Sequence, residues 1–220
     1  MMLASQHIQT NYPSINLFDK VSLALQLMDE YEVMHLPVLS EEKFAGLVSK
    51  DDLLDTDENN TIASLEFLLI KACIKISEHF IAALHQASEF NLSLIAVVNE
   101  QSELIGVIPS TELLKLAARF TGSDEPGGII VLEVERRNYS FGEISRLVET
   151  NDASIMQLNT MSETDSGLLL VTIKLNKIEV SDIVATFQRY DYQIRYYFGE
   201  EQYANELKEN YNHLISYLNI

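Results

Sequence analysis

The first half of the chain alternates short apolar runs with amphipathic stretches. Apolar runs of strand length lie at residues 14–17, 33–39 and 44–48. Between the first two runs, residues 20–31 carry four apolar side chains on one helical face, namely Val21, Ala24, Leu25 and Met28. Residues 50–54 open a further short helix. The pattern predicts an α/β unit in the order strand, helix, strand, strand, helix.

The same pattern occurs a second time along the chain. Gly46 corresponds to Gly106, a shift of 60 residues (106 − 46 = 60), and Leu53-Leu54 corresponds to Leu113-Leu114. In the same way, Leu36-Pro37-Val38-Leu39 aligns with Ile95-Ala96-Val97-Val98. A fixed period of this length is typical of a duplicated supersecondary unit. The sequence therefore predicts two copies of one α/β unit in tandem.

The turn at residues 46–52 brings polar groups to the start of the short helix in the first copy. Ser49 is the predicted N-cap, and Asp52 lies three residues further on. A helix start offers unpaired N–H groups that suit a phosphate, and a carboxylate suits the vicinal hydroxyls of a ribose. The same two residues also fit a capping box, in which they only stabilise the helix. Both interpretations stay open at this stage.

Two such units in tandem resemble a pair of CBS domains, the module named after cystathionine β-synthase. The resemblance rests on the Leu36-Pro37-Val38 strand and on the Gly46-x-x-Ser49-x-x-Asp52 turn. It implies a regulatory adenine nucleotide as ligand. The candidates are AMP, ADP or ATP, with or without Mg²⁺, and S-adenosylmethionine.

The resemblance also implies roles for individual residues. Ser49 is expected to meet a phosphate and Asp52 the ribose hydroxyls, while the base is expected at the residues Leu36 and Pro37. Lys50 is a further candidate for a phosphate oxygen. His35 directly precedes this strand, where it is either a wall of the adenine pocket or a strand-edge histidine.

The second copy keeps the apolar pattern but changes the polar groups. Pro109 stands where the first copy has Ser49, and Glu112 stands where it has Asp52. Proline has neither the hydroxyl nor a backbone donor, and the longer glutamate displaces the carboxylate by one methylene. We therefore expect one functional nucleotide position, in the first copy.

The second half of the chain begins after a run of Gly, Pro and polar residues. Strands are predicted at residues 129–134, 153–161, 168–175 and 193–198, and helices at residues 141–149 and 180–190. The order βαββαβ is that of a ferredoxin-like sandwich with four antiparallel strands and two helices on one face.

This half resembles an ACT domain, a small regulatory fold that often binds amino acids. The resemblance rests on the element order and on the stretch at residues 143–153. The loop at residues 135–140 lacks the proline and glycine of the family's ligand-binding turn, which favours a dimerising sheet. A pair of CBS domains followed by an ACT-like domain resembles bacterial acetoin-utilisation-type regulatory proteins.

The predicted fold class is α/β, with a CBS-domain pair (duplicated βαββα) followed by an α+β ferredoxin-like, ACT-like domain and a C-terminal helix. The pair occupies residues 1–121, with repeats at about 3–60 and 61–121, and a linker follows at residues 122–128. The ACT-like domain occupies residues 129–199. Residues 200–220 are predicted to be a helix with an apolar stripe of Tyr203, Leu207, Tyr211, Leu214 and Leu218.

Composition narrows the classes of partner. The formal net charge of −18 disfavours binding to a nucleic-acid backbone. No apolar run approaches the roughly 20 residues that cross a membrane, and the N-terminus lacks the basic and apolar regions of a signal peptide. The single cysteine, Cys73, excludes an internal disulfide framework and fits a reducing compartment. These features predict a cytoplasmic protein with no nucleic-acid or membrane partner.

Residues for catalysis or metal binding are not grouped in the sequence. The five histidines show no zinc-ligand spacing, and no nucleophile elbow or phosphate-binding glycine loop occurs. The leading hypothesis is a non-catalytic homodimer, formed through the pair and the ACT-like sheet, that senses an adenine nucleotide in the pair and transmits its occupancy to the ACT-like domain. The alternative is a ligand-independent oligomerisation or adaptor protein with vestigial clefts.

Overall fold

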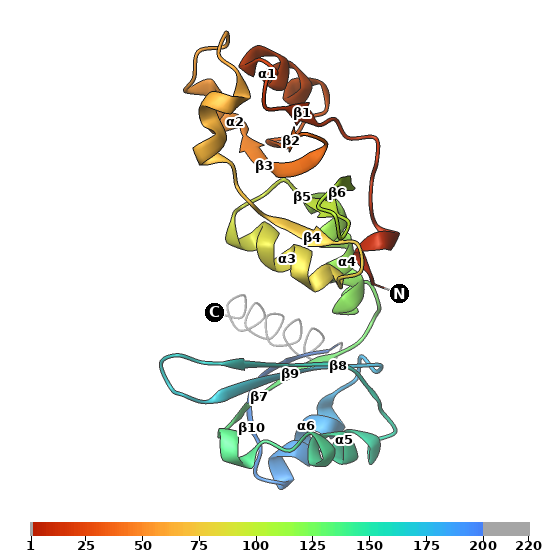
Figure 1. Cartoon of the computed structure of the whole chain (residues 1–220). Coiled ribbons are helices and arrows are strands. Elements are labelled where there is room, and N and C mark those ends of the chain that lie inside the picture. The colour runs from red at the N-terminus through yellow and green to blue at the C-terminus, as the bar shows by residue number, and fades with distance from the viewer. Residues whose placement is uncertain (1, 200–220) are drawn as a thin grey trace, which may run out of the picture. The chain divides into compact units, whose positions relative to one another are not determined.

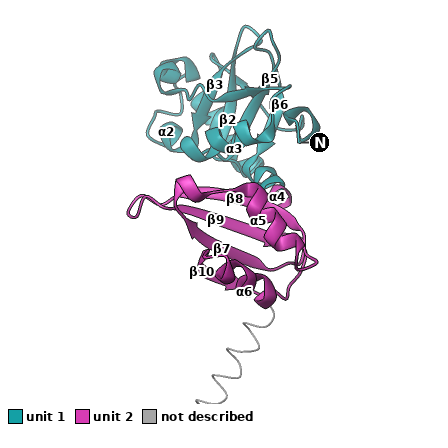
Figure 2. Ribbon diagram, turned by 90° about the horizontal axis from the view of Figure 1, so that it is seen from below, with its two compact units in different colours: residues 1–117 teal, residues 118–220 magenta. Residues whose placement is uncertain are grey.

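The computed structural model describes residues 2–199 (Figure 1). The chain divides into two compact units, residues 1–117 and residues 118–220 (Figure 2). The helix predicted from sequence at residues 200–220 lies outside the described residues. Each unit has its own apolar core.

The first unit contains two repeats, as the sequence predicts. After a 3-10 turn, η1 (Ala4–Gln6), the first repeat comprises β1 (Ile15–Asn16), α1 (Val21–Glu30), β2 (His35–Ser40), β3 (Lys43–Ser49) and α2 (Lys50–Leu54). A 3-10 connector, η2 (Ile62–Leu68), leads to the second repeat. This repeat comprises β4 (Cys73–Lys75), α3 (Phe80–Glu89), β5 (Leu94–Val98), β6 (Leu104–Pro109) and α4 (Ser110–Phe120).

The two repeats share strand order, register and irregularities. Each forms a three-stranded sheet with a parallel pair followed by an antiparallel pair, in the orders β1-β2-β3 and β4-β5-β6. Val38 pairs with Gly46 in the first sheet, and Val97 pairs with Gly106 in the second. A register shift follows directly after the valine in both sheets. The duplication thus extends to the backbone.

The segment that precedes each repeat pairs with the edge strand of the other repeat's sheet. We call these two segments the exchanged segments. Ile70, which precedes the second repeat, bonds to Leu47 of β3 through N–H···O distances of 2.9 and 2.8 Å. Gln9, which precedes the first repeat, bonds to Val107 of β6 at 2.8 and 3.0 Å. Buried side chains of both repeats belong to one apolar cluster. The two repeats therefore form a single packed body.

Glycine is needed where each exchanged segment crosses the sheet. Gly46 has φ +151°, and a Cβ built there would lie 2.8 Å from Leu69 Cβ and 3.2 Å from Ile70 O. Gly106 has φ +159°, and its Cβ would lie 2.5 Å from a methyl of Ile8. Such distances are far inside van der Waals contact, so the crossing requires a residue without a side chain.

The second unit has the predicted ferredoxin-like order. It comprises β7 (Ile129–Val134), a 3-10 turn η3 (Arg136–Asn138), α5 (Phe141–Glu149), β8 (Ile155–Ser162), β9 (Leu169–Leu175), α6 (Ser181–Arg189) and β10 (Gln193–Phe198). The four strands form an antiparallel sheet in the order β10-β7-β9-β8. Helices α5 and α6 cover one face of this sheet (Figure 1). The core lies between helices and sheet, where Phe187 of α6 is fully buried.

Gly46→Ala and Gly106→Ala should each lower the free energy of unfolding of the first unit by about 1–3 kcal/mol, because the new methyl group must displace the crossing segment. Urea unfolding followed by circular dichroism measures this effect. Gly142→Ala is the matched control, since a Cβ there meets nothing within 4 Å. An unchanged unfolding midpoint in both the Gly46 and the Gly106 variant would contradict the tight crossing.

Candidate functional site

Ser49 and Asp52 bond to each other at the start of α2. Ser49 is the N-cap, as predicted, and its Oγ accepts the backbone N–H of Asp52 at 3.1 Å. The hydroxyl in turn donates to Oδ2 of Asp52 at 2.6 Å. The first bond is the one expected of helix capping, whereas the second joins the two side chains instead of running from the Ser49 backbone N–H to the acid as in a capping box. The second bond also holds a hydroxyl and a carboxylate side by side, as the binding interpretation requires.

Lys50 lies next to these groups but is turned towards α1. Its Nζ forms an ion pair with Asp29 Oδ1 at 2.5 Å. The Lys50 side chain is only 24% exposed, whereas that of Asp29 is 70% exposed. A ligand phosphate that approaches Lys50 would therefore compete with a carboxylate already in place.

His35 and Pro37 lie on the same face of the sheet as Ser49. His35 is paired with Ser49 across the β2–β3 ladder, and directly paired residues project their side chains to the same face. Pro37 follows two residues later and returns to that face. Leu36 projects to the opposite face, where it is fully buried beside its partner Val48.

His35 connects the first repeat to the second. Its Nδ1 accepts the backbone N–H of Ser93 at 3.2 Å and lies 3.0 Å from the Ser93 hydroxyl. That hydroxyl accepts the backbone N–H of Met34 at 3.2 Å. Because Nδ1 accepts, the neutral ring carries its proton on Nε2. This link joins the edge of the candidate site to the other repeat.

Sequence reasoning missed Ser93, which no motif includes. In the two ladders, Ser93 precedes Leu94 as Met34 precedes His35, and the carbonyl oxygens of Ser93 and Met34 accept equivalent N–H groups from Ser110 and Lys50. An alignment of the two repeats would have shown that the polar Ser93 occupies the position of the apolar Met34. It would not have shown the contact.

Burial lowers the pKa of His35 below its ordinary value of 6.5. Desolvation is the largest cause, since only 8% of the residue is exposed. The charges of Asp51 and Asp52 act in the opposite direction and favour the protonated ring. The protonation of this imidazole therefore depends on the charge of Asp52 in the candidate site and on that of its neighbour Asp51.

The second repeat differs at each corresponding position. Pro109 pairs with Leu94 as Ser49 pairs with His35, so neither the hydroxyl nor the imidazole is present. The carboxylate of Glu112 lies 3.4 Å from Nδ1 of His7 and 3.8 Å from Nζ of Lys115. His7 belongs to the N-terminal segment that crosses the second sheet. Glu112, the acid of the second repeat, thus has His7 and Lys115 of the same chain as partners.

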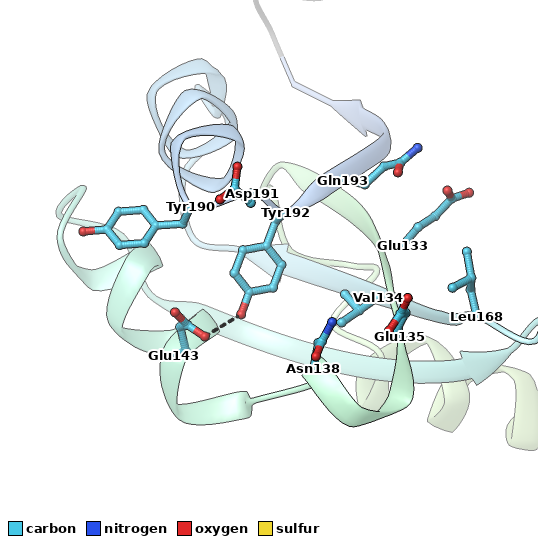
Figure 3. Close-up of a pocket in the computed structure, with 10 residues that line it drawn as sticks. All are labelled: Glu133, Val134, Glu135, Asn138, Glu143, Leu168, Tyr190, Asp191, Tyr192 and Gln193. Atoms are coloured by element: carbon cyan, nitrogen blue, oxygen red, sulfur yellow. Dashed lines mark hydrogen bonds between the residues drawn. The ribbon is translucent and has the colours of Figure 1, made fainter.

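A cavity of about 730 Å³ lies in the second unit, at one end of the sheet (Figure 3). Its lining includes Glu133, Glu135, Glu143 and Asp191, together with Tyr190 and Tyr192.

Three of the carboxylates that line this cavity have side-chain partners among the described residues, namely Glu133, Glu135 and Glu143. Tyr192 donates to Glu143 Oε2 at 3.0 Å, Glu133 lies 3.4 Å from Arg195, and Glu135 lies 2.6 Å from Arg137. Burial, followed by the hydrogen bond to Glu143, raises the pKa of Tyr192 to about 12. The charges of Glu133 and Glu135 are therefore balanced by arginines of the chain, while Glu143 is held by a neutral hydroxyl.

Residues 2–199 hold neither a cluster of metal ligands nor a helix that could span a membrane. Within these residues, no three His, Cys, Asp or Glu side chains gather as a metal site would require. None of their helices has the length and hydropathy needed to cross a bilayer.

Comparison with known proteins identifies one family and several similar structures. The family model "CBS domain" matches residues 4–59. A CBS domain pair/ACT domain protein from Thermotoga maritima is 21% identical, with a TM-score of 0.49 over 54% of this chain and 98% of that one. CBSX2 in complex with AMP is 20% identical, with a TM-score of 0.44 over 55% of this chain and 98% of the other.

The cytosolic domain of the Mg²⁺ channel MgtE in complex with ATP is also similar, at 15% identity and a TM-score of 0.45 over 52% of this chain and 48% of that one. The family match covers the first repeat, including Ser49 and Asp52. The fold is mixed α/β, with a duplicated unit whose first repeat matches the CBS family model, followed by a ferredoxin-like sheet.

His35 should make the stability of the first unit pH-dependent. As the pH falls through 6.5, the unfolded chain takes up a proton on this residue before the folded chain does, so the free energy of unfolding decreases. Urea midpoints at about pH 7.5 and about pH 5.5 should therefore fall further apart in the parent than in His35→Asn, whose amide oxygen can replace the Nδ1 acceptor. Equal differences in both proteins would contradict the lowered pKa.

Proposed function

We propose that the first unit binds an adenine nucleotide at the first repeat and that the protein is a non-catalytic regulator. The observation that carries this proposal is the pairing of Ser49 and Asp52 on the face that also bears His35 and Pro37. The CBS family match over this repeat supports it. The AMP and ATP complexes of two similar structures give the class of ligand to test.

In this proposal, the Ser49 hydroxyl binds a phosphate oxygen and the Asp52 carboxylate binds the ribose hydroxyls. Both groups exchange their mutual hydrogen bond for bonds to the ligand, so the hydrogen bonds are conserved in number. The base lies against Pro37 and His35. Leu36 is buried in the core behind them and supports this strand by packing. Lys50 leaves Asp29 to meet a phosphate.

Electrostatics limits the charge of the ligand. Lys50 is already paired with Asp29, while Asp51 and Asp52 lie near His35, and the whole chain carries a formal charge of −18. Each additional phosphate on the ligand therefore adds repulsion unless a cation accompanies it. The site favours AMP or S-adenosylmethionine over free ATP, and Mg²⁺ is expected to improve the binding of ATP.

The regulatory part of the proposal is that occupancy passes from the first unit to the ferredoxin-like unit, which serves as the dimerising element of a homodimer. The His35–Ser93 link is the described contact between the candidate site and the second repeat, from whose last helix, α4, the chain enters the second unit. A ligand that binds Asp52 changes the field at His35 and thereby the strength of this link.

Nucleotide binding should raise the thermal stability of the chain. At one hundred times its dissociation constant, a ligand specific for the folded state adds about 2.7 kcal/mol to the free energy of unfolding. Thermal shifts with AMP, ADP, ATP and S-adenosylmethionine, each with and without Mg²⁺, measure this effect. We expect one bound ligand per chain, and a shift that is lost in Ser49→Ala and Asp52→Asn.

Glu112→Gln is the matched control, since it alters the corresponding acid of the second repeat, which His7 already contacts. This variant should keep the nucleotide-induced shift of the parent. If Asp52→Asn and Glu112→Gln both retain the full shift, the nucleotide binds elsewhere and the site named here is wrong.

A second candidate function is a ligand-independent oligomerisation or adaptor protein. It is favoured by the mutual saturation of Ser49 and Asp52 and by the contact of His7 with Glu112, because both acids are satisfied without a ligand. The adaptor function predicts a stable dimer by light scattering whose mass and partner binding do not respond to nucleotide. The sensor function predicts that nucleotide changes one or both.

A further inference from the structure

The sheet of the second unit has one face that α5 and α6 do not cover (Figure 1). Alternation along the strands defines its residues. In β7, Ile130, Leu132 and Val134 belong to the core beneath the helices, so the intervening residues Ile129, Val131 and Glu133 project to the other face. We call this second face the open face.

The ladder pairings extend the open face across all four strands. From β10 to β8, its rows are Gln193, Glu133, Leu170 and Met161, then Tyr196, Val131, Thr172 and Asn159, then Phe198, Ile129, Lys174 and Gln157. Six of these twelve side chains are polar or charged, but Val131 and Leu170 are buried and form an apolar centre. Met161, Tyr196 and Phe198 are exposed around it.

The open face is also hollowed. A cavity of about 200 Å³ is lined by Ile129, Gln157, Asn159, Thr172 and Lys174 of the face, together with Thr121 and Ser123. A concave apolar and polar surface of this kind suits the side chains of a packed helix, as a flat polar sheet face would not.

The chain enters its final segment at the open face. Phe198, the last residue of β10, lies on that face in the same row as Ile129 and Lys174. The 21 residues that follow, 200–220, carry the apolar stripe from Tyr203 to Leu218 that their spacing predicts for a helix. A helix of this length spans about 30 Å, close to the length of an eight-residue strand such as β8, at roughly 27 Å.

The charge of residues 200–220 is opposite to that of Lys174 on the open face. Residues 200–220 contain four glutamates, Glu200, Glu201, Glu206 and Glu209, against one lysine. The row of the open face at which this segment begins carries Lys174. Opposite charges at the point of entry favour a segment that turns back over the face.

We propose that residues 200–220 form an amphipathic helix that packs its stripe on the open face of its own chain. The linkage is short, since Gly199 alone separates Phe198 from the segment, which keeps the effective concentration for docking within the chain far above that of a second copy. The docked helix completes the second unit as a three-layer arrangement of helices, sheet and helix.

Thiol crosslinking tests this proposal in the full-length chain. Cys73→Ser removes the single native thiol, and Thr172→Cys with Leu207→Cys then places one thiol on the open face and one on the stripe. A short bismaleimide should join them within one chain, giving a monomer with a mass increase of one crosslinker. The yield should not depend on protein concentration.

The control replaces Leu207→Cys with Glu209→Cys, which lies on the opposite side of the predicted helix. Its yield should be several-fold lower. A second pair, Asn159→Cys with Leu214→Cys, uses the edge strand β8 in case the Thr172 variant does not fold. Crosslinked dimers would show that a second copy occupies the face, and equal yields at 207 and 209, or none with either pair, would show that the segment does not dock. Each of these results overturns the proposal.

Discussion

The first unit depends on backbone hydrogen bonds that its two repeats exchange. The segment before the second repeat bonds through Ile70 to Leu47 at the edge of one sheet, and the segment before the first bonds through Gln9 to Val107 at the edge of the other. An unpaired sheet edge exposes a row of donors and acceptors. Because each repeat completes the edge of the other, neither has its full complement of backbone bonds alone, and the pair folds around one core.

The same exchange makes the repeats chemically unequal. The segment across the second sheet carries His7, which contacts Glu112. The position that corresponds to His7 in the segment across the first sheet is residue 68 (70 − 9 = 61; 7 + 61 = 68), a leucine that offers no hydrogen bond. Asp52 is therefore left to Ser49, from which a ligand can displace it at no net loss of hydrogen bonds. The asymmetry follows from what each crossing segment carries as well as from Pro109.

Local and periodic signals in the sequence were sufficient for the fold. The duplication, the βαββαβ order and the Ser49 cap all follow from apolar spacing or from residues within one turn of each other, and the structure confirms them. The side chain of Leu36 projects away from Ser49, which the alternation of a strand would have indicated. Contacts of His35 with Ser93 and of His7 with Glu112 join residues 58 and 105 positions apart (93 − 35 = 58; 112 − 7 = 105), and no local pattern encodes such pairs.

In the proposed nucleotide sensor, charge and burial around His35 couple the candidate site to the second repeat. Its imidazole is mostly removed from water, which disfavours the protonated ring, while Asp51 and Asp52 favour it. In the proposed sensor, a nucleotide that binds Asp52 brings the negative charge of its phosphates near His35. Its ribose also occupies the Asp52 carboxylate. The electrostatic field at the imidazole therefore depends on the charge of the ligand. The neutral Nδ1 accepts the backbone N–H of Ser93, which a protonated Nδ1 could not accept. Under this proposal, a weakly charged ligand is expected to preserve the hydrogen bond between His35 and Ser93, whereas a polyphosphate without its cation is expected to weaken it.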